Sequence, residues 1–266
     1  MKIHKPCAVA FLSCMLMTGC GGDGDGRPAF RADRSTAQGL YDGTIVYSNG
    51  SSLSFNQQTV VLETGEFFIV YGETLNNTFF VDGMLHGTGQ IGAASNTFYS
   101  YDLSDHFFRN NAIDAVFDGR LTASFEPGNF FNGHARQKDS TANFQGVAPQ
   151  AAVYTYNTPA NLNDVIGDWV MIDLLGNQPT MNITAPGIFS GAYSNGCSFS
   201  GSLTPRTSGK NIFNMTIAFG PTPCTQPNQS FTGVAYDYSP STISRTLVMA
   251  GLTSNGDQAA VLYGIR

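Results

Sequence analysis

Charge is scarce in this sequence, and positive charge is the scarcer sign. Asp, Glu, Lys and Arg make up only 12% of the 266 residues, with 13 basic residues against 19 acidic ones. Lys2 and Lys5 stand at the very start, and beyond them the only lysines are Lys138 and Lys210. Nucleic-acid binding requires clustered basic side chains that neutralise phosphates. The composition therefore excludes a nucleic-acid partner and a basic membrane-binding patch.

Recognisable catalytic motifs are also missing. The chain has no Gly-x-Ser-x-Gly, Ser-x-x-Lys or His-Glu-x-x-His motif and no phosphate-binding glycine loop. His86, His106 and His134 stand singly, and a Ser-His-Asp group with Asp102 or Asp105, or a metal site, would have to be assembled by the fold. We expect a non-enzymatic protein with no cofactor and no metal.

One apolar run is long enough to be considered as a membrane span or a signal peptide, and it lies at the start of the sequence. Residues Cys7 to Met17 are apolar except for Ser13 and follow the basic residues Lys2, His4 and Lys5. A bilayer requires about 20 apolar residues, so this run fits the hydrophobic region of a signal peptide instead. An ordinary secretory signal with a nearby cleavage site is one interpretation of this leader.

The segment Met17-Thr18-Gly19-Cys20 resembles the lipobox of bacterial lipoproteins. The resemblance implies that residues 1–19 are removed and that the Cys20 thiol receives a diacylglycerol. Acyl chains contribute about 0.8 kcal/mol per buried methylene, so two or more of them, such as palmitate, hold a protein stably at a membrane. Because Gly21 and not Asp follows the cysteine, the pattern resembles that of outer-membrane lipoproteins. Residues 20–38, which begin with a Gly/Asp-rich stretch, are expected to form a flexible tether.

Few cysteines remain once this leader is set aside. Cys7 and Cys14 leave with the signal peptide, and Cys20 carries the lipid. Cys197 and Cys224 are then an even pair in an oxidising compartment, which predicts a disulfide. Two free buried thiols are the alternative. A zinc site would need further ligands, and the C-terminal half has no histidine.

Helical patterns are absent after the leader, and turn residues recur every 8–12 positions between β-branched and aromatic runs. This spacing predicts an all-β fold of antiparallel meanders, either barrels or sandwiches. We divide the chain into a β-domain at 39–156, a connector at 157–166 and an eight-stranded domain at 167–266. One continuous barrel or sandwich across both halves is the alternative. The strands expected in the C-terminal domain are 168–173, 179–184, 187–193, 197–204, 210–219, 230–239, 245–252 and 258–265.

The N-terminal domain is less regular. Tight hairpins are expected at Glu63–Glu66 and Glu126–Asn129, whereas 102–114 is expected to be a loop or a single helical turn. A short helix is expected at Pro159–Val165 in the connector. The strands expected here are 40–48, 58–63, 66–72, 77–92, 96–102, 112–126, 129–137, 141–147 and 151–156.

A Phe-x-Gly pattern recurs in both halves. Phenylalanine and the residue two positions later share one face of a strand, and a glycine permits close packing or a bend in a barrel wall. Core packing is therefore the favoured interpretation, and a row of ligand-stacking aromatics is the alternative. The pattern begins at Phe117, Phe131, Phe144, Phe189, Phe199 and Phe231.

An exposed binding anchor is predicted at Phe107, Phe108 and Arg109, because aromatic and arginine side chains are favoured at interfaces. The alternative is that the two phenylalanines pin the segment 102–114 to the core.

The leader, the glycine tether and the eight-stranded meander together resemble bacterial surface lipoproteins with small β-barrels, among them the transferrin- and factor-H-binding lipoproteins. The segment Gly196-Cys197-Ser198-Phe199-Ser200-Gly201 resembles uncharacterised proteobacterial lipoproteins. The resemblance implies a lipid-anchored outer-membrane protein that binds a protein or another envelope or extracellular partner. A lipocalin-like carrier of a small apolar ligand and a periplasmic hydrolase are the alternatives. No residue motif allows a ligand to be transferred from these families.

Overall fold

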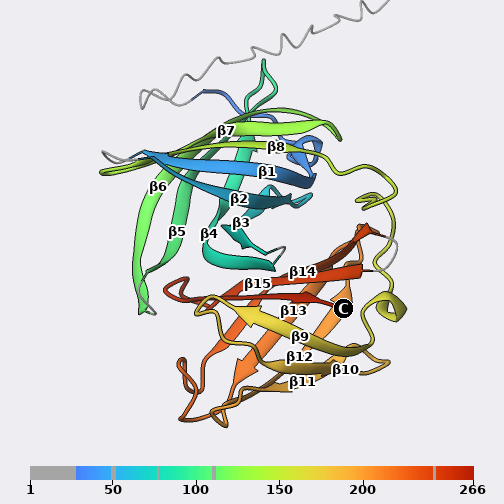
Figure 1. The fold of residues 1–266 in the computed structure, drawn as a ribbon. Coiled ribbons are helices and arrows are strands. Elements are labelled where there is room, and N and C mark those ends of the chain that lie inside the picture. Colours follow the sequence, from blue (N-terminus) through green and yellow to red (C-terminus); the bar gives the residue numbers. More distant parts are fainter. Residues whose placement is uncertain (1–27, 49–51, 77, 110–111, 242–243) are drawn as a thin grey trace, which may run out of the picture.

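The computed structural model shows two antiparallel β-barrels stacked on each other and joined by a connector (Figure 1). It describes residues 28–48, 52–76, 78–109, 112–241 and 244–266, so the predicted signal peptide and Cys20 lie outside the described residues. Helical structure in the described chain is limited to two 3-10 turns, η1 (Ser35–Ala37) and η2 (Leu162–Asp164). None of the described helices is long and apolar enough to cross a membrane.

The first barrel is an eight-stranded meander in which every strand pairs with the next. It closes when β8 pairs antiparallel with β1, with Asp42 opposite Val147. Tight turns join β2 to β3 and β6 to β7 as predicted, and Gly65 (φ 83°) and Gly128 (φ 68°) adopt the left-handed conformation there. Its strands are β1 (Gly39–Ser48), β2 (Ser52–Val61), β3 (Glu66–Leu75), β4 (Thr78–Ile91), β5 (Thr97–Arg109), β6 (Ala112–Glu126), β7 (Phe130–Gln137) and β8 (Thr141–Val147).

The second barrel repeats this plan with the last eight strands. It closes through β9, which pairs with both β10 and β16. All eight strands predicted here are present, and the alternative of one continuous barrel is wrong because each half closes on itself. Its strands are β9 (Gly167–Asp173), β10 (Thr180–Ile183), β11 (Ile188–Ala192), β12 (Ser198–Pro205), β13 (Phe213–Phe219), β14 (Ser230–Ser241), β15 (Ser244–Leu252) and β16 (Ala259–Ile265).

Three local predictions need correction. The segment 102–114 is not a loop or helical turn but the end of β5 and the start of β6, two arms of one long hairpin. The strand expected at 151–156 is replaced by turns. The short helix expected at Pro159–Val165 is reduced to the single 3-10 turn η2, whose first turn is capped by Asn161 accepting a hydrogen bond from the Asn163 amide.

Aromatic side chains fill both barrel interiors. The interior of the first barrel contains Tyr41, Tyr47, Phe55, Phe67, Tyr71, Phe98, Phe131 and Phe144. The interior of the second contains Trp169, Met171, Met181, Phe189, Phe199, Phe213, Met215 and Phe231. Such interiors are packed cores, because an eight-stranded barrel is just wide enough for side chains to fill it.

The Phe-x-Gly pattern has the predicted packing role in most places. On β11 and β12 two copies pair so that each phenylalanine lies opposite the glycine of the other, Phe189 facing Gly201 and Phe199 facing Gly191. The ring of Phe199 occupies the space that a side chain at Gly191 would need. The copies on β7 and β8 pair in the same reciprocal way. Phe117 is the exception, since 44% of it is exposed.

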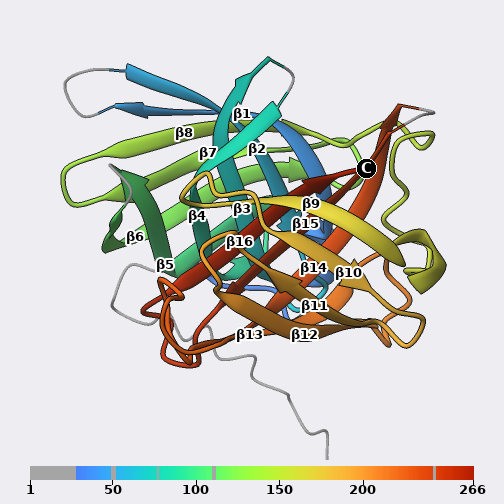
Figure 2. The ribbon, with the colours of Figure 1, turned by 60° about the horizontal axis from the view of Figure 1, so that its bottom comes forward.

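A third apolar core lies between the two barrels, and we call it the seam. Figures 1 and 2 show the outer face of β2–β4 lying against the outer face of β14–β16. The strands that form it are consequently buried on both faces. Its members include Val60, Phe68, Val70, Phe79, Met84, Val234, Tyr236, Tyr238, Val248, Val261 and Tyr263, joined by Tyr154 and Tyr156 of the connector.

Polar contacts also cross the seam. The Tyr236 hydroxyl donates to Gln58 Oε1 at 3.2 Å, and the Arg206 guanidinium pairs with Glu63 at 2.7 Å. The Arg206 contact lowers the pKa of Glu63, although burial opposes this. Apolar burial and directional bonds together fix how one barrel sits on the other.

Candidate functional site at the seam between the barrels

The predicted binding anchor at Phe107, Phe108 and Arg109 lies at the end of β5. Phe107 points inward and packs against Tyr47 and Tyr71, with ring centroids 6.2 and 6.3 Å apart. At this residue the alternative of a core-pinning phenylalanine holds. The side chains of Phe108 and Arg109 lie outside the described part of the structure.

The three histidines lie on three different strands, β4, β5 and β7. His106 and Asp105 are adjacent in sequence and therefore point to opposite sides of β5. His106 is 1% exposed with its Nε2 3.3 Å from Ser104 Oγ, and burial lowers its pKa to about 4. His86 contacts Glu66 at 3.1 Å, and His134 lies on β7. Among the described residues no group of three or more His, Cys, Asp or Glu side chains is arranged to hold a metal.

Asp105 is buried inside the first barrel, where it accepts several hydrogen bonds. It accepts from the hydroxyls of Tyr47 (3.0 Å) and Tyr71 (2.8 Å), and from the Gln137 amide. Burial raises the pKa of this carboxyl group, and the three donors act in the opposite direction. The buried carboxyl is thus fully engaged in holding strands together.

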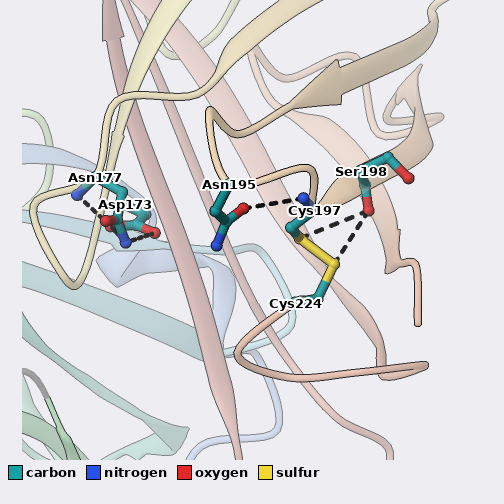
Figure 3. The surroundings of a disulfide bond; sticks show 6 residues. All are labelled: Asp173, Asn177, Asn195, Cys197, Ser198 and Cys224. Atoms are coloured by element: carbon teal, nitrogen blue, oxygen red, sulfur yellow. Dashed lines mark hydrogen bonds between the residues drawn. A yellow bond between two sulfur atoms is a disulfide. The ribbon is translucent and has the colours of Figure 1, made fainter. Parts of the chain in front are cut away.

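The disulfide predicted between Cys197 and Cys224 is present at one end of the second barrel (Figure 3). It ties the turn before β12 to the loop between β13 and β14, and the Cys197 amide donates to Asn195 Oδ1 at 2.9 Å. The cavity beside it, lined by Tyr193, Phe219 and Leu262 among others, measures about 50 Å³. That volume suits a few water molecules and not a carried ligand.

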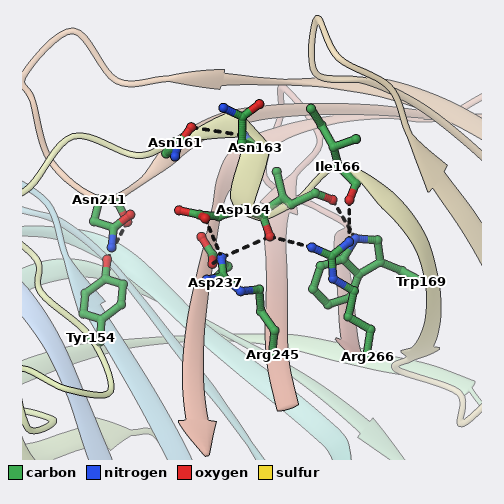
Figure 4. A network of polar contacts seen from close by, with 11 residues as sticks. Tyr154, Asn161, Asn163, Asp164, Ile166, Trp169, Asn211, Asp237, Arg245 and Arg266 are labelled. Atoms are coloured by element: carbon green, nitrogen blue, oxygen red, sulfur yellow. Dashed lines mark hydrogen bonds and ion pairs between the residues drawn. The ribbon is translucent and has the colours of Figure 1, made fainter. Parts of the chain in front are cut away.

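Charged side chains close the other end of this barrel (Figure 4). Arg245 pairs with Asp237 at 2.6 Å and with Asp164 at 3.2 Å. Arg266 donates to the Asp164 carbonyl at 2.9 Å and lies 4.6 Å from the centre of the Trp169 ring. These contacts fasten the C-terminus to the connector, and each charge already has a partner.

Two open depressions lie elsewhere on the surface. One, of about 630 Å³, lies on the outer wall formed by β9–β11, beside the exposed side chains Val170 and Ile265. Its charged residues are engaged, Asp168 by Asn182 and Arg266 by the contacts above. The other, of about 430 Å³, lies beside the connector. Neither presents a charged group that lacks a partner.

A pocket whose lining includes a carboxylate oxygen without a hydrogen-bond partner lies at the edge of the seam, and we call it the seam pocket. It measures about 300 Å³, at the lower end of the range for small-molecule sites. Both barrels build it, the first through β1–β4 and the second through β14 and β16. The side chains that line it include Asp42, Gln58, Thr74, Phe79, Tyr238 and Tyr263.

Asp42 is the distinctive group of the seam pocket. It lies opposite Gln58 on the neighbouring strand, and its Oδ1 atom is buried without a hydrogen-bond partner. Burial raises the pKa of Asp42 from 3.8 to about 6, and a hydrogen bond with Gln58 partly offsets this. An unsatisfied buried carboxylate oxygen is costly, and Asp42 is the one charged residue among those that line the seam pocket.

The sequence interpretation did not identify this pocket, although one signal was available. Leu247–Leu252 and Ala259–Tyr263 are nearly continuous apolar runs, whereas a barrel wall that faces water alternates apolar and polar residues. Such runs indicate that the outer face of β15 and β16 is covered. They do not indicate which strands cover it, so Asp42 could not be placed there.

Comparisons with known proteins give no family. No family model matches the chain, and no curated protein matches it. Several solved structures show weak similarity, among them the following three. One is a DUF3598-family protein of unknown function from Nostoc punctiforme PCC 73102, which is 11% identical with a TM-score of 0.26 and covers 88% of this chain and 98% of its own.

The second is a candidate outer membrane protein from Bacteroides fragilis NCTC 9343, 13% identical with a TM-score of 0.31, covering 88% of this chain and 100% of its own. The third is the isotype 1 transferrin binding protein B from serogroup B Neisseria meningitidis, 9% identical with a TM-score of 0.25, covering 87% and 77%. These TM-scores are too low to support an inference, and none is drawn from them.

Proposed function

We propose that the chain is a non-enzymatic, lipid-anchored protein of the bacterial outer membrane that binds an envelope or extracellular partner. The observation that carries this proposal is the order of elements at the N-terminus. A basic start, a short apolar run, the Met17–Cys20 segment and a glycine-rich stretch follow one another. A lipid on Cys20 would hold the two barrels at the membrane surface.

The architecture favours binding on the outside of the barrels. Side chains fill both interiors, and the cavity at the disulfide end of the second barrel is only about 50 Å³. A carrier of the lipocalin type needs an interior that holds its ligand. The filled interiors therefore count against the carrier alternative and favour recognition at the outer walls or the seam.

The anchor is tested by Cys20→Ser, with Cys14→Ser in the apolar leader as the matched control. We expect the unaltered protein and Cys14→Ser to fractionate with outer membranes, and mass spectrometry to find a diacylglyceryl group on an N-terminal Cys20. Cys20→Ser is expected to appear in the soluble fraction. A mature N-terminus at another residue, without lipid, would refute the anchor.

The non-enzymatic part is tested separately. The purified chain is incubated with a panel of ester, peptide, glycoside and phosphate substrates, beside His86→Ala and His106→Ala variants. We expect no turnover by any of the three proteins. Turnover by the unaltered chain that one histidine variant loses would establish the hydrolase alternative instead.

A further inference from the structure

The chemistry of the seam pocket selects for a positive charge. Its lining contains one carboxylate, that of Asp42, and the described residues around it include no lysine or arginine. The other polar groups are amides and hydroxyls, which are neutral. The carboxylate of Asp42 would attract a cation that enters the pocket and would repel an anion.

Aromatic rings make up the apolar part of the lining. Phe79 of β4 and Tyr263 of β16 lie with ring centroids 5.0 Å apart, one from each barrel. Tyr238 joins them, its hydroxyl 3.3 Å from that of Tyr263. Aromatic rings attract cations through the negative charge of their faces, and they tolerate the methyl groups of a quaternary ammonium ion.

The Oδ1 atom of Asp42 has no hydrogen-bond partner. The Gln58 amide lies opposite Asp42, but its own Oε1 accepts the Tyr236 hydroxyl, so this amide is engaged from both sides. The remaining carboxylate oxygen is buried with nothing to pair it. A bound cation would compensate this charge where the protein itself does not.

We propose that the seam pocket binds a small organic ammonium ion, which is held by the Asp42 carboxylate and by the rings of Phe79, Tyr238 and Tyr263. A divalent metal fits less well, because no three ligating side chains converge among the described residues. The volume of about 300 Å³ also exceeds that of a single ion and suits an ammonium group with a short organic substituent. The proposal does not depend on the lipid anchor.

Calorimetric titration with choline tests the proposal on the purified full chain. The uncharged analogue 3,3-dimethylbutan-1-ol has the same shape, and it isolates the contribution of the charge. We expect saturable choline binding that is at least about tenfold tighter than binding of the analogue. Equal binding of the two compounds, or binding of neither choline nor phosphatidylcholine vesicles, would overturn the proposal.

Two variants locate the binding. Asp42→Asn keeps the shape of the side chain and removes its charge, and Tyr263→Leu removes one ring. Each is expected to weaken choline binding about tenfold or more. Asp118→Asn, which neutralises an exposed carboxylate on β6, is the matched control and is expected to bind as the unaltered chain does. Unchanged binding by Asp42→Asn would refute the site.

The pH dependence gives a readout that a purely structural role would not produce. The groups that face Asp42 are Gln58 on β2, Tyr236 and Tyr238 on β14, and Tyr263 on β16. Burial holds the pKa values of Tyr236 and Tyr238 well above their usual range, so these two remain neutral. Choline affinity is therefore expected to rise as the pH passes through about 6 and Asp42 ionises.

The ammonium group could be free or part of a lipid headgroup, and vesicles separate the two sources. Binding of choline in solution by the unaltered chain and by Cys20→Ser supports a free ligand. Binding only to phosphatidylcholine vesicles, in Cys20→Ser but not in the double variant that also carries Asp42→Asn, supports a headgroup. If Cys20→Ser binds choline normally, the seam-pocket proposal stands even if the lipid-anchor proposal fails.

Discussion

Replacing Asp42 by asparagine is expected to stabilise the protein at neutral pH. Burial at the seam raises the pKa of Asp42 from 3.8 to about 6. A carboxyl group with a raised folded pKa holds its proton more tightly in the folded chain than in the unfolded chain. Its ionisation therefore lowers the free energy of unfolding as the pH rises from about 4 to about 6, and the loss is constant above that range.

The magnitude follows from the same values. A change of one in pKa corresponds to about 1.4 kcal/mol, so the rise at Asp42 gives an upper bound of about 3 kcal/mol at pH 7. The side chain is not completely enclosed, and we expect a gain of about 1–2 kcal/mol for Asp42→Asn. Asparagine keeps an oxygen that can accept from Gln58, so the change removes the charge and little else.

Urea unfolding of the unaltered chain, Asp42→Asn and Asp118→Asn measures this gain at about pH 4 and about pH 7.5. The gain at the lower pH is expected to be less than a third of that at the higher pH, because Asp42 is then protonated in the folded protein. Asp118→Asn should follow the unaltered chain at both values. If Asp42→Asn is no more stable at pH 7.5, or gains equally at both, the buried-carboxylate reasoning is wrong.

Three further changes test the rest of the fold by urea unfolding. Cys197→Ser together with Cys224→Ser opens the disulfide across a sequence separation of 27, and is expected to cost about 3.5 kcal/mol through a less constrained unfolded chain; no loss would contradict the bond. Asp105→Ala leaves three donors without their acceptor, two of them the buried hydroxyls of Tyr47 and Tyr71, and should cost about 3 kcal/mol or more, whereas Asp105→Asn should cost less. Val248→Asp places a charge in the seam and should lower the free energy of unfolding by at least about 3 kcal/mol. Val147→Asp, at a site that is 59% exposed, should be tolerated. Similar losses for the two variants would show that the seam contributes little to stability.

The second barrel was predictable because local signals agree there. Turn glycines such as Gly196 and Gly256 adopt the left-handed conformation at the ends of hairpins, and they punctuate the sequence at regular intervals. Each strand pairs with its neighbour in the chain, so strand order follows sequence order. The disulfide also needed only the count of cysteines. In such a meander, local turn chemistry determines most of the topology.

Two segments of the first half were mispredicted because distant partners decide them. Asp105 faces the barrel interior and breaks the apolar alternation of β5. The sequence pattern therefore predicted a loop or a single helical turn at 102–114. Its hydrogen-bond donors come from β1, β3 and β7, so its burial cannot be inferred from neighbouring residues. The opposite error occurred at 151–156. There Tyr154 and Tyr156 pack into the seam from turns and imitate the alternation of a strand.

The seam pocket could not be predicted from the sequence for the same reason. Its position between the barrels also explains why a destabilising carboxylate, that of Asp42, is present there. Asp42 lies on the outer face of β1, where a single barrel would leave it in water and its charge would cost nothing. Only the second barrel encloses it, by placing Tyr238 and Tyr263 beside it. Barrel packing alone would favour an asparagine, because the charge destabilises the seam at neutral pH. A residue that weakens the fold while remaining unpaired is expected where it serves a ligand, and the gain in stability and the loss of choline binding by Asp42→Asn should therefore occur together.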